Sequence, residues 1–259
     1  MPTTDTKGLA LTQLRLPKAI EHELRMFCEA MLDRYWGKIR SLTVYGSVAR
    51  HEYNPDRSDI NLLIVMEDCS LEALRPALEP IHKARDGCRL TPFFLTPQDI
   101  DTSRDVFPIK FYDMRDAYVV IYGQDVLGEL KIDDANLRLE LEQELKILLL
   151  ELRQFFIQRS RKGAPPGTEH FHAYFNSFLY LVKRLLKLLS VSGDLNSTDE
   201  LIGLATKHLD IDKGLLRRLH EEHHKGKPIK NLLEQVPAFY GAVEKVATVV
   251  DRLTVASRS

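Results

Sequence analysis

The first half of the chain alternates short apolar runs with helical stretches. Four runs bounded by turn-forming residues predict β-strands at 41–45, 60–66, 88–96 and 117–122. Helical spacing of apolar residues predicts helices at 17–35, 71–86 and 108–116. Strands that alternate with helices in this way predict a sheet covered by helices.

From about residue 131 onward the strand signal disappears, and apolar residues recur at intervals of three and four. This spacing predicts helices at 137–160, 170–189, 197–208, 212–224 and 231–253. Amphipathic helices joined by short connections are typical of an antiparallel bundle. We therefore expect a layered domain of strands and helices over residues 1–130 and an all-α helical bundle over residues 131–259.

Composition and charge narrow the classes of function. The 259 residues are 44% hydrophobic and 28% charged, which is ordinary for a folded globular protein. Lys and Arg number 36 against 37 Asp and Glu, so bulk charge does not attract the chain to nucleic acid. No apolar run approaches the roughly 20 residues of a membrane span. Three cysteines without paired spacing and an N-terminus without a secretory pattern predict a cytoplasmic protein.

The candidate chemistry begins where the first predicted strand ends, at Gly46-Ser47. We expect a helix to begin there, and helix-start N–H groups with a serine hydroxyl can bind phosphate oxygens. Asp59 stands at the head of the next strand, where a carboxylate could hold Mg²⁺ against the same phosphates. The alternative interpretation is structural, because glycine in a turn, a serine N-cap and a capped aspartate are ordinary at element ends.

The segments GSVAR (46–50) and SDINL (58–62) resemble the signature of the DNA polymerase β-type nucleotidyltransferase superfamily, which includes bacterial aminoglycoside nucleotidyltransferases. The similarity covers about residues 40–96, and several members also carry a helical bundle after the catalytic half. The resemblance implies an α+β fold, in which a nucleotidyltransferase-type mixed sheet with flanking helices is followed by an all-α helical bundle. It also implies that the chain binds a nucleoside triphosphate. It places Gly46 and Ser47 at the triphosphate, Arg50 nearby and Asp59 as a Mg²⁺ ligand.

The chain departs from this family at two positions expected to carry catalytic carboxylates. Asn61 stands at the second position and Thr91 at the third, and no Asp or Glu occurs between Asp86 and Asp99. An amide is a neutral ligand, and a threonine hydroxyl cannot act as a base near neutral pH. Loss of general-base assistance typically costs about 10²–10⁴-fold in rate. We therefore expect nucleotide binding with weak use of Mg²⁺ and reduced or no nucleotidyl transfer.

Two alternatives remain open at this point. The first is an active transferase that adds a nucleotide to a small molecule, RNA or protein, using a carboxylate from outside the expected positions. The nearest such carboxylates are Glu67, Asp68 and Asp99. The second is a non-enzymatic scaffold whose helical domain binds a partner or forms a homodimer, which predicts an apolar patch on the bundle. The sequence identifies neither the nucleotide nor the acceptor.

A second motif, His220-Glu221-x-x-His224, matches the zinc-protease pattern of two histidines on one helix face. Its neighbours include Arg217 and Arg218, which indicates an exposed helix end rather than a buried catalytic helix. We therefore expect no zinc protease. His170 and His172 lie beside aromatic residues and are expected in the bundle core or at a helix start.

Overall fold

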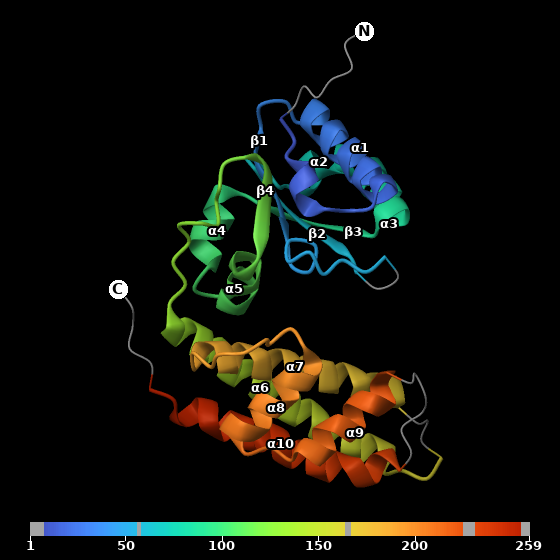
Figure 1. The fold of residues 1–259 in the computed structure, drawn as a ribbon, viewed down its shortest axis with the longest axis vertical. Coiled ribbons are helices and arrows are strands. Elements are labelled where there is room, and N and C mark those ends of the chain that lie inside the picture. The colour runs from blue at the N-terminus through green and yellow to red at the C-terminus, as the bar shows by residue number, and fades with distance from the viewer. Residues whose placement is uncertain (1–7, 56–57, 164–166, 225–230, 255–259) are drawn as a thin grey trace. The chain divides into compact units, whose positions relative to one another are not determined.

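A computed structural model describes residues 8–55, 58–163, 167–224 and 231–254 of the chain (Figure 1). The chain forms two compact units, Met1–Ile132 and Asp133–Ser259. The first holds a mixed sheet with flanking helices and the second is helical, which confirms the predicted fold class.

The sheet of the first unit has four strands in the order β3-β2-β1-β4. Strand β1 (Ile39–Tyr45) pairs antiparallel with β2 (Ile60–Met66) and with β4 (Tyr118–Gly123). Strand β3 (Leu90–Leu95) pairs parallel with β2 and forms one edge of the sheet. All four strands begin and end within two residues of the predicted segments, because each is a short apolar run bounded by turn residues.

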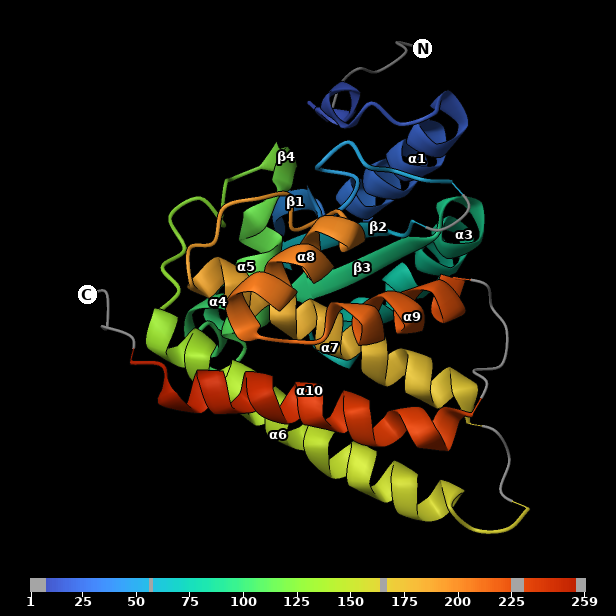
Figure 2. The ribbon, with the colours of Figure 1, turned by 60° about the horizontal axis from the view of Figure 1, so that its bottom comes forward.

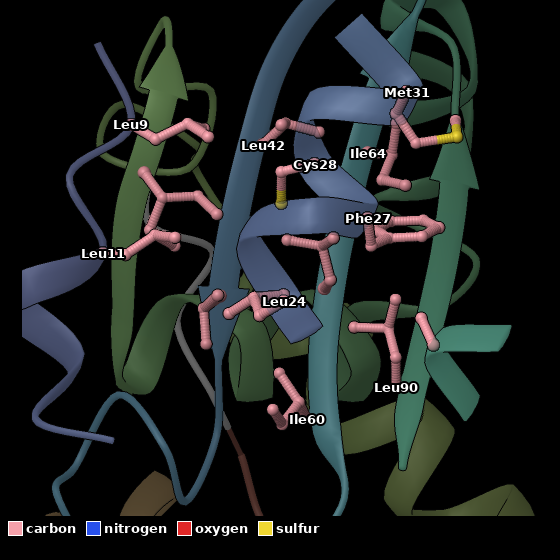
Figure 3. Close-up of a cluster of buried hydrophobic side chains, with 14 of the residues drawn as sticks. Leu9, Leu11, Leu24, Phe27, Cys28, Met31, Leu42, Ile60, Ile64 and Leu90 are labelled. Atoms are coloured by element: carbon pink, nitrogen blue, oxygen red, sulfur yellow. The ribbon is translucent and has the colours of Figure 1, made fainter. Parts of the chain in front are cut away.

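One face of the sheet is covered by α1 (Lys18–Arg34) and α3 (Leu78–Cys88). Figure 3 shows Phe27 and Cys28 of α1 packed over the strand residues Leu42 and Ile64. A short 3-10 helix, η1 (Leu11–Leu14), lies beside β4, and the preceding Ala10 N–H donates to the Ile121 carbonyl at 2.9 Å. Strand β4 therefore has a partner on its outer edge.

The opposite face is covered by α4 (Pro97–Ser103) and α5 (Pro108–Asp116). Phe111 and Met114 of α5 pack there against Leu63 and Val65 of β2. Helix α5 was predicted with the same bounds. Its position on this face matters below, because Gly46, Asn61 and Thr91 meet on the same side of the sheet.

Two local features of this unit differ from the prediction. The expected helix at 71–86 is divided into α2 (Leu71–Leu74), the 3-10 turn η2 (Arg75–Ala77) and α3, because Pro76 has no N–H and cannot continue an α-helix. Helix α4 was not predicted. It begins with a capping box in which the Thr96 hydroxyl accepts from the Asp99 N–H at 3.0 Å.

The second unit contains α6 (Asp134–Arg159), α7 (Thr168–Leu188), α8 (Thr198–Leu209), α9 (Lys213–His224) and α10 (Leu232–Arg252). All five helices were predicted. Figure 2 shows α10 lying along α6, and three phenylalanines of α7 surround Phe239 of α10 at ring-centroid distances of 5.2, 6.0 and 5.3 Å. No helix in the described part of the chain is long and apolar enough to cross a membrane.

Candidate functional site

Four side chains form a row across one end of the sheet. Thr91 of β3 stands opposite Asn61 of β2, Asn61 stands opposite Tyr45 of β1, and Tyr45 stands opposite Tyr118 of β4. Residues in register on paired strands project from the same face. Thr91 is exposed, Asn61 is half-buried and Tyr45 is buried. The two positions at which the resemblance implies carboxylates are therefore neighbours in space.

Asp59 lies one residue before β2 and, by strand alternation, faces the same side as Asn61. Its Oδ1 accepts a hydrogen bond from Nε of Arg89 at 3.0 Å, and both side chains are about half exposed (51% and 48%). Arg89 follows α3 in a left-handed conformation, and its carbonyl accepts from the Ile60 N–H at 3.1 Å. The turn between α3 and β3 thus places a guanidinium against the expected metal ligand.

Gly46 directly follows β1 and has a positive φ of 82°. Its N–H donates to the Ala117 carbonyl at 3.0 Å, and a Cβ at this position would lie 3.3 Å from Nδ2 of Asn61. Glycine is therefore required here by the backbone conformation and by the close approach of Asn61. The N–H of Gly46 is used within the fold, so any phosphate contact at this turn falls to neighbouring groups.

The segment after Gly46 forms a single turn, so the expectation of a helix beginning there is wrong. The Arg50 N–H donates to the Gly46 carbonyl at 3.1 Å, but His51 then adopts a positive φ of 61°, which ends the turn. The Nε of Arg50 donates to Glu52 at 2.8 Å, which offsets its charge. Within the described residues, the Ser47 hydroxyl has no hydrogen-bond partner and remains available to a ligand.

Helix α5 adds charged groups on this face that the sequence did not reveal. The Lys110 Nζ lies 5.7 Å from the ring centroid of Tyr45 and 5.1 Å from that of Phe93. Burial, and secondly the charge of Asp113, raises the pKa of Tyr45 to about 12, so its phenol stays protonated at neutral pH. The sequence predicted this helix, but its spacing alone did not show which charged side chains approach the strands.

The comparison with known proteins bears on the fold. No protein-family model and no curated protein matches the chain. Among solved structures, it is similar to spectinomycin adenyltransferase AAD(9) from Enterococcus faecialis, crystallised with ATP and spectinomycin. The match has a TM-score of 0.57 at 12% identity and covers 86% of this chain and 98% of that one. The chain has a nucleotidyltransferase fold.

In this nucleotidyltransferase fold, the donor set at the end of the sheet does not fit a resident pair of magnesium ions. Mg²⁺ prefers carboxylate oxygens in octahedral geometry. Here Asp59 is paired with Arg89, and its neighbours Asn61 and Thr91 offer a neutral amide and a hydroxyl. Across the described residues, no group of three or more His, Cys, Asp or Glu side chains is arranged to hold a metal.

The carboxylates considered as substitutes lie at the other end of the sheet. Glu67 directly follows β2 and accepts from Nε of Arg40 at 2.6 Å, and Asp68 accepts from the Ser70 N–H at 2.8 Å. Asp99 follows β3 and is part of the capping box of α4. Seven strand residues span roughly 20 Å. None of the three can therefore assist chemistry beside Asp59.

The zinc-protease-like motif lies on α9, and the side chain of His224 is outside the described residues. Within this helix, His223 contacts His172 of α7, with ring centroids 4.7 Å apart. Burial lowers the pKa of His172, and the charge of Glu222 acts in the opposite direction. This contact belongs to the packing of the helical unit.

Proposed function

We propose that this protein binds nucleoside triphosphates through its first unit and carries out little or no nucleotidyl transfer. The observation that carries the proposal is the row at the end of the sheet. Asn61 and Thr91 stand side by side where carboxylates are expected, and Asp59 is paired with Arg89. The similarity in fold to an adenyltransferase crystallised with ATP supports nucleotide as the ligand.

The chemistry of the transfer explains why turnover should be low. A hydroxyl attacks the α-phosphate and pyrophosphate leaves, and two metal ions normally stabilise the attacking and leaving oxygens. A site whose single carboxylate, Asp59, is paired with Arg89 lacks both the metal ligands and the base for this step. Absence of the base alone should reduce the rate by about 10²–10⁴-fold. Binding is less demanding, because Mg²⁺ can be held by one carboxylate together with the phosphates of the nucleotide.

The test is a thermal-shift series with ATP, GTP, CTP and UTP, each with and without Mg²⁺, together with an assay of pyrophosphate release. We expect at least one nucleotide to stabilise the protein, by about 2.7 kcal/mol at a hundred times its Kd. Pyrophosphate release should stay near background. If no nucleotide stabilises the protein, the binding proposal is wrong. If pyrophosphate is released rapidly by the wild type but not by Asp59→Ala, the protein is an active transferase.

One observation favours a second candidate function, self-association through the helical unit. Several apolar side chains of α6 are solvent-exposed: Leu139 (46%), Ile147 (48%), Leu150 (57%), Phe156 (41%) and Ile157 (65%). Ile147, Leu150 and Ile157 share one helix face by their spacing. Glu144 flanks the N-terminal half of this face and Arg153 the C-terminal half, so two antiparallel copies would bring opposite charges together.

A homodimer through α6 is tested by light scattering on the wild type and on Leu150→Glu/Ile157→Glu. We expect a dimer that the double variant converts to a monomer, because two charges would be buried in the contact. Leu71→Glu, at a position 82% exposed in the first unit, is the control and should leave the mass unchanged. A wild-type protein that is monomeric at every concentration would exclude this candidate.

A further inference from the structure

The ammonium group of Lys110 lies over the middle of the β3-β2-β1 part of the sheet. Its two ring partners come from the strands on either side of β2, Tyr45 from β1 and Phe93 from β3, at 5.7 and 5.1 Å. Tyr45 is in register with Asn61, and Phe93 is in register with Leu63. All four side chains project from the same face. The register therefore places the ammonium above β2, between Asn61 and Leu63.

This ammonium is held weakly and keeps its hydrogen-bonding capacity. Among the described residues, Lys110 forms no hydrogen bond or ion pair, and the side chain is exposed. Contacts between a cation and an aromatic ring contribute about 0.5–1 kcal/mol at exposed sites. The three N–H donors of the ammonium can therefore turn to an anion that enters from solvent.

The acidic groups near Lys110 leave its charge available. Asn61, which is in register with Tyr45 on the same face, is neutral, whereas an aspartate there would add a negative charge beside the ammonium. Asp59 is already paired with Arg89. Asp113 lies one helical turn from Lys110 on α5, and its charge acts on the phenol of Tyr45. The neutral amide of Asn61 thus leaves the ammonium of Lys110 available to bind an anion.

We propose that Lys110 supplies the positive charge that holds the nucleotide phosphates beside Asn61, so that binding does not require Mg²⁺. The inference rests on the proposed nucleotide binding and specifies how it is achieved. A lysine binds phosphate as a compact point charge with three donors. This role also accounts for the amide at position 61, because a carboxylate there would form an ion pair with Lys110 and compete with the phosphates.

The experiment is calorimetric titration of ATP and of inorganic triphosphate into the full-length protein, in EDTA and in Mg²⁺. The variants are Lys110→Met, Lys110→Arg and the control Lys83→Met, an exposed lysine on α3 at the opposite face of the sheet. The wild-type Kd should differ by less than about threefold between the two conditions, which is about 0.65 kcal/mol in binding free energy. In EDTA, Lys110→Met should weaken binding by roughly tenfold to a hundredfold, the range for a lost hydrogen bond to a charged group. Lys110→Arg should retain most of the affinity, and Lys83→Met all of it.

Asn61→Asp provides an independent variant that leaves Lys110 in place. The new carboxylate should pair with the ammonium and weaken ATP binding in EDTA by on the order of tenfold. Asn61→Ser, which is neutral, is its matched control and should bind ATP in EDTA more tightly than Asn61→Asp does. This pair of variants tests the role of the Lys110 charge even if Lys110→Met does not fold.

The outcomes separate the inference from the proposed function. If Lys110→Met binds ATP in EDTA as tightly as the wild type, the role of Lys110 is wrong and nucleotide binding stands. If the wild type binds only when Mg²⁺ is present, the metal supplies the charge and the inference is likewise overturned. If neither ATP nor triphosphate binds under any condition, both fail.

Discussion

The guanidinium of Arg89 donates from Nε to Oδ1 of Asp59 at 3.0 Å, so the carboxylate expected to bind metal carries its own counter-charge. The two residues come from neighbouring strand starts and are fixed by the parallel pairing of β2 with β3. A cation in this position competes with Mg²⁺ for the same oxygen. The pairing supports the proposed weak use of metal, with no change needed at Asp59 itself.

Removal of this counter-charge should increase the contribution of Mg²⁺. In Arg89→Met, the ATP affinity measured with Mg²⁺ should rise relative to that in EDTA by several-fold, roughly 1 kcal/mol. The cost in folding stability should be about 0–1 kcal/mol, because the pair is half exposed. Calorimetry on this variant and on Arg85→Met, an exposed arginine of α3, provides the comparison. An unchanged Mg²⁺ effect in Arg89→Met would show that Asp59 is not restrained by Arg89.

Restoring the carboxylates should create a metal site. Asn61→Asp with Thr91→Glu places two like charges on neighbouring strands, which should destabilise the metal-free protein by about 0.2–1 kcal/mol. Mg²⁺ alone should then raise the melting temperature of the double variant but not of the wild type, because the metal binds only the folded state. Asn61→Asp with Thr91→Gln is the control. If Mg²⁺ has no effect on the double variant, positions 61 and 91 are not the metal-binding pair.

Gly46 should be less tolerant of substitution than a glycine of similar backbone conformation. Gly46 and Gly37 have φ values of 82° and 72°, so alanine at either should cost about 1–2 kcal/mol from the left-handed backbone. Only at Gly46 would the added Cβ press against Asn61, whereas at Gly37 it meets open space. We expect Gly46→Ala to show the larger loss in urea unfolding and also to weaken ATP binding. Equal losses in the two variants would argue against the contact between Gly46 and Asn61.

The helical unit should lose stability in mild acid through His172. Burial lowers the pKa of this residue below the value of about 6.5 expected in the unfolded chain. Below about pH 6.5 the unfolded state therefore binds more protons, and stability falls as the pH drops towards the folded-state pKa. The loss is complete once both states are protonated.

Urea unfolding at about pH 7 and about pH 5 measures this effect. His172→Gln cannot be protonated, so its midpoint should fall less between the two pH values than that of the wild type. His82→Gln, on the exposed side of α3, should behave as the wild type does. If His172→Gln shows the full wild-type loss, His172 is not the responsible group.

The strands and the five helices of the second unit could be predicted because their apolar residues repeat with the period of the element they form. Strand β2 has the predicted bounds, and so does α5. The sequence also carried signals that were not used for prediction. Pro76 divides the helix expected at 71–86, and the Thr96-Pro97-x-Asp99 segment is a capping box with proline at the first helical position.

The candidate site could be predicted only in part. Gly46 was found from its place at the end of a predicted strand, whereas Asn61 and Thr91 were identified only through the family resemblance. The register brings Asn61 between Thr91 and the end of β1. Arg89 and Lys110 were missed because neither belongs to a motif. Their importance depends on which residue stands opposite on a neighbouring strand and on which face of a helix meets the sheet. Those relationships arise from the three-dimensional register and leave no local pattern.

The edges of the sheet limit how copies of this protein can associate. A free edge strand invites pairing with a strand of another molecule, which leads to polymers. At one edge, β3 contains Pro92, which has no N–H to give to an incoming strand. At the other edge, the Ala10 N–H already occupies the Ile121 carbonyl of β4. Pairing with a strand of another molecule is therefore hindered at both edges. Concentrated solutions of the protein should accordingly resist fibril growth through this sheet.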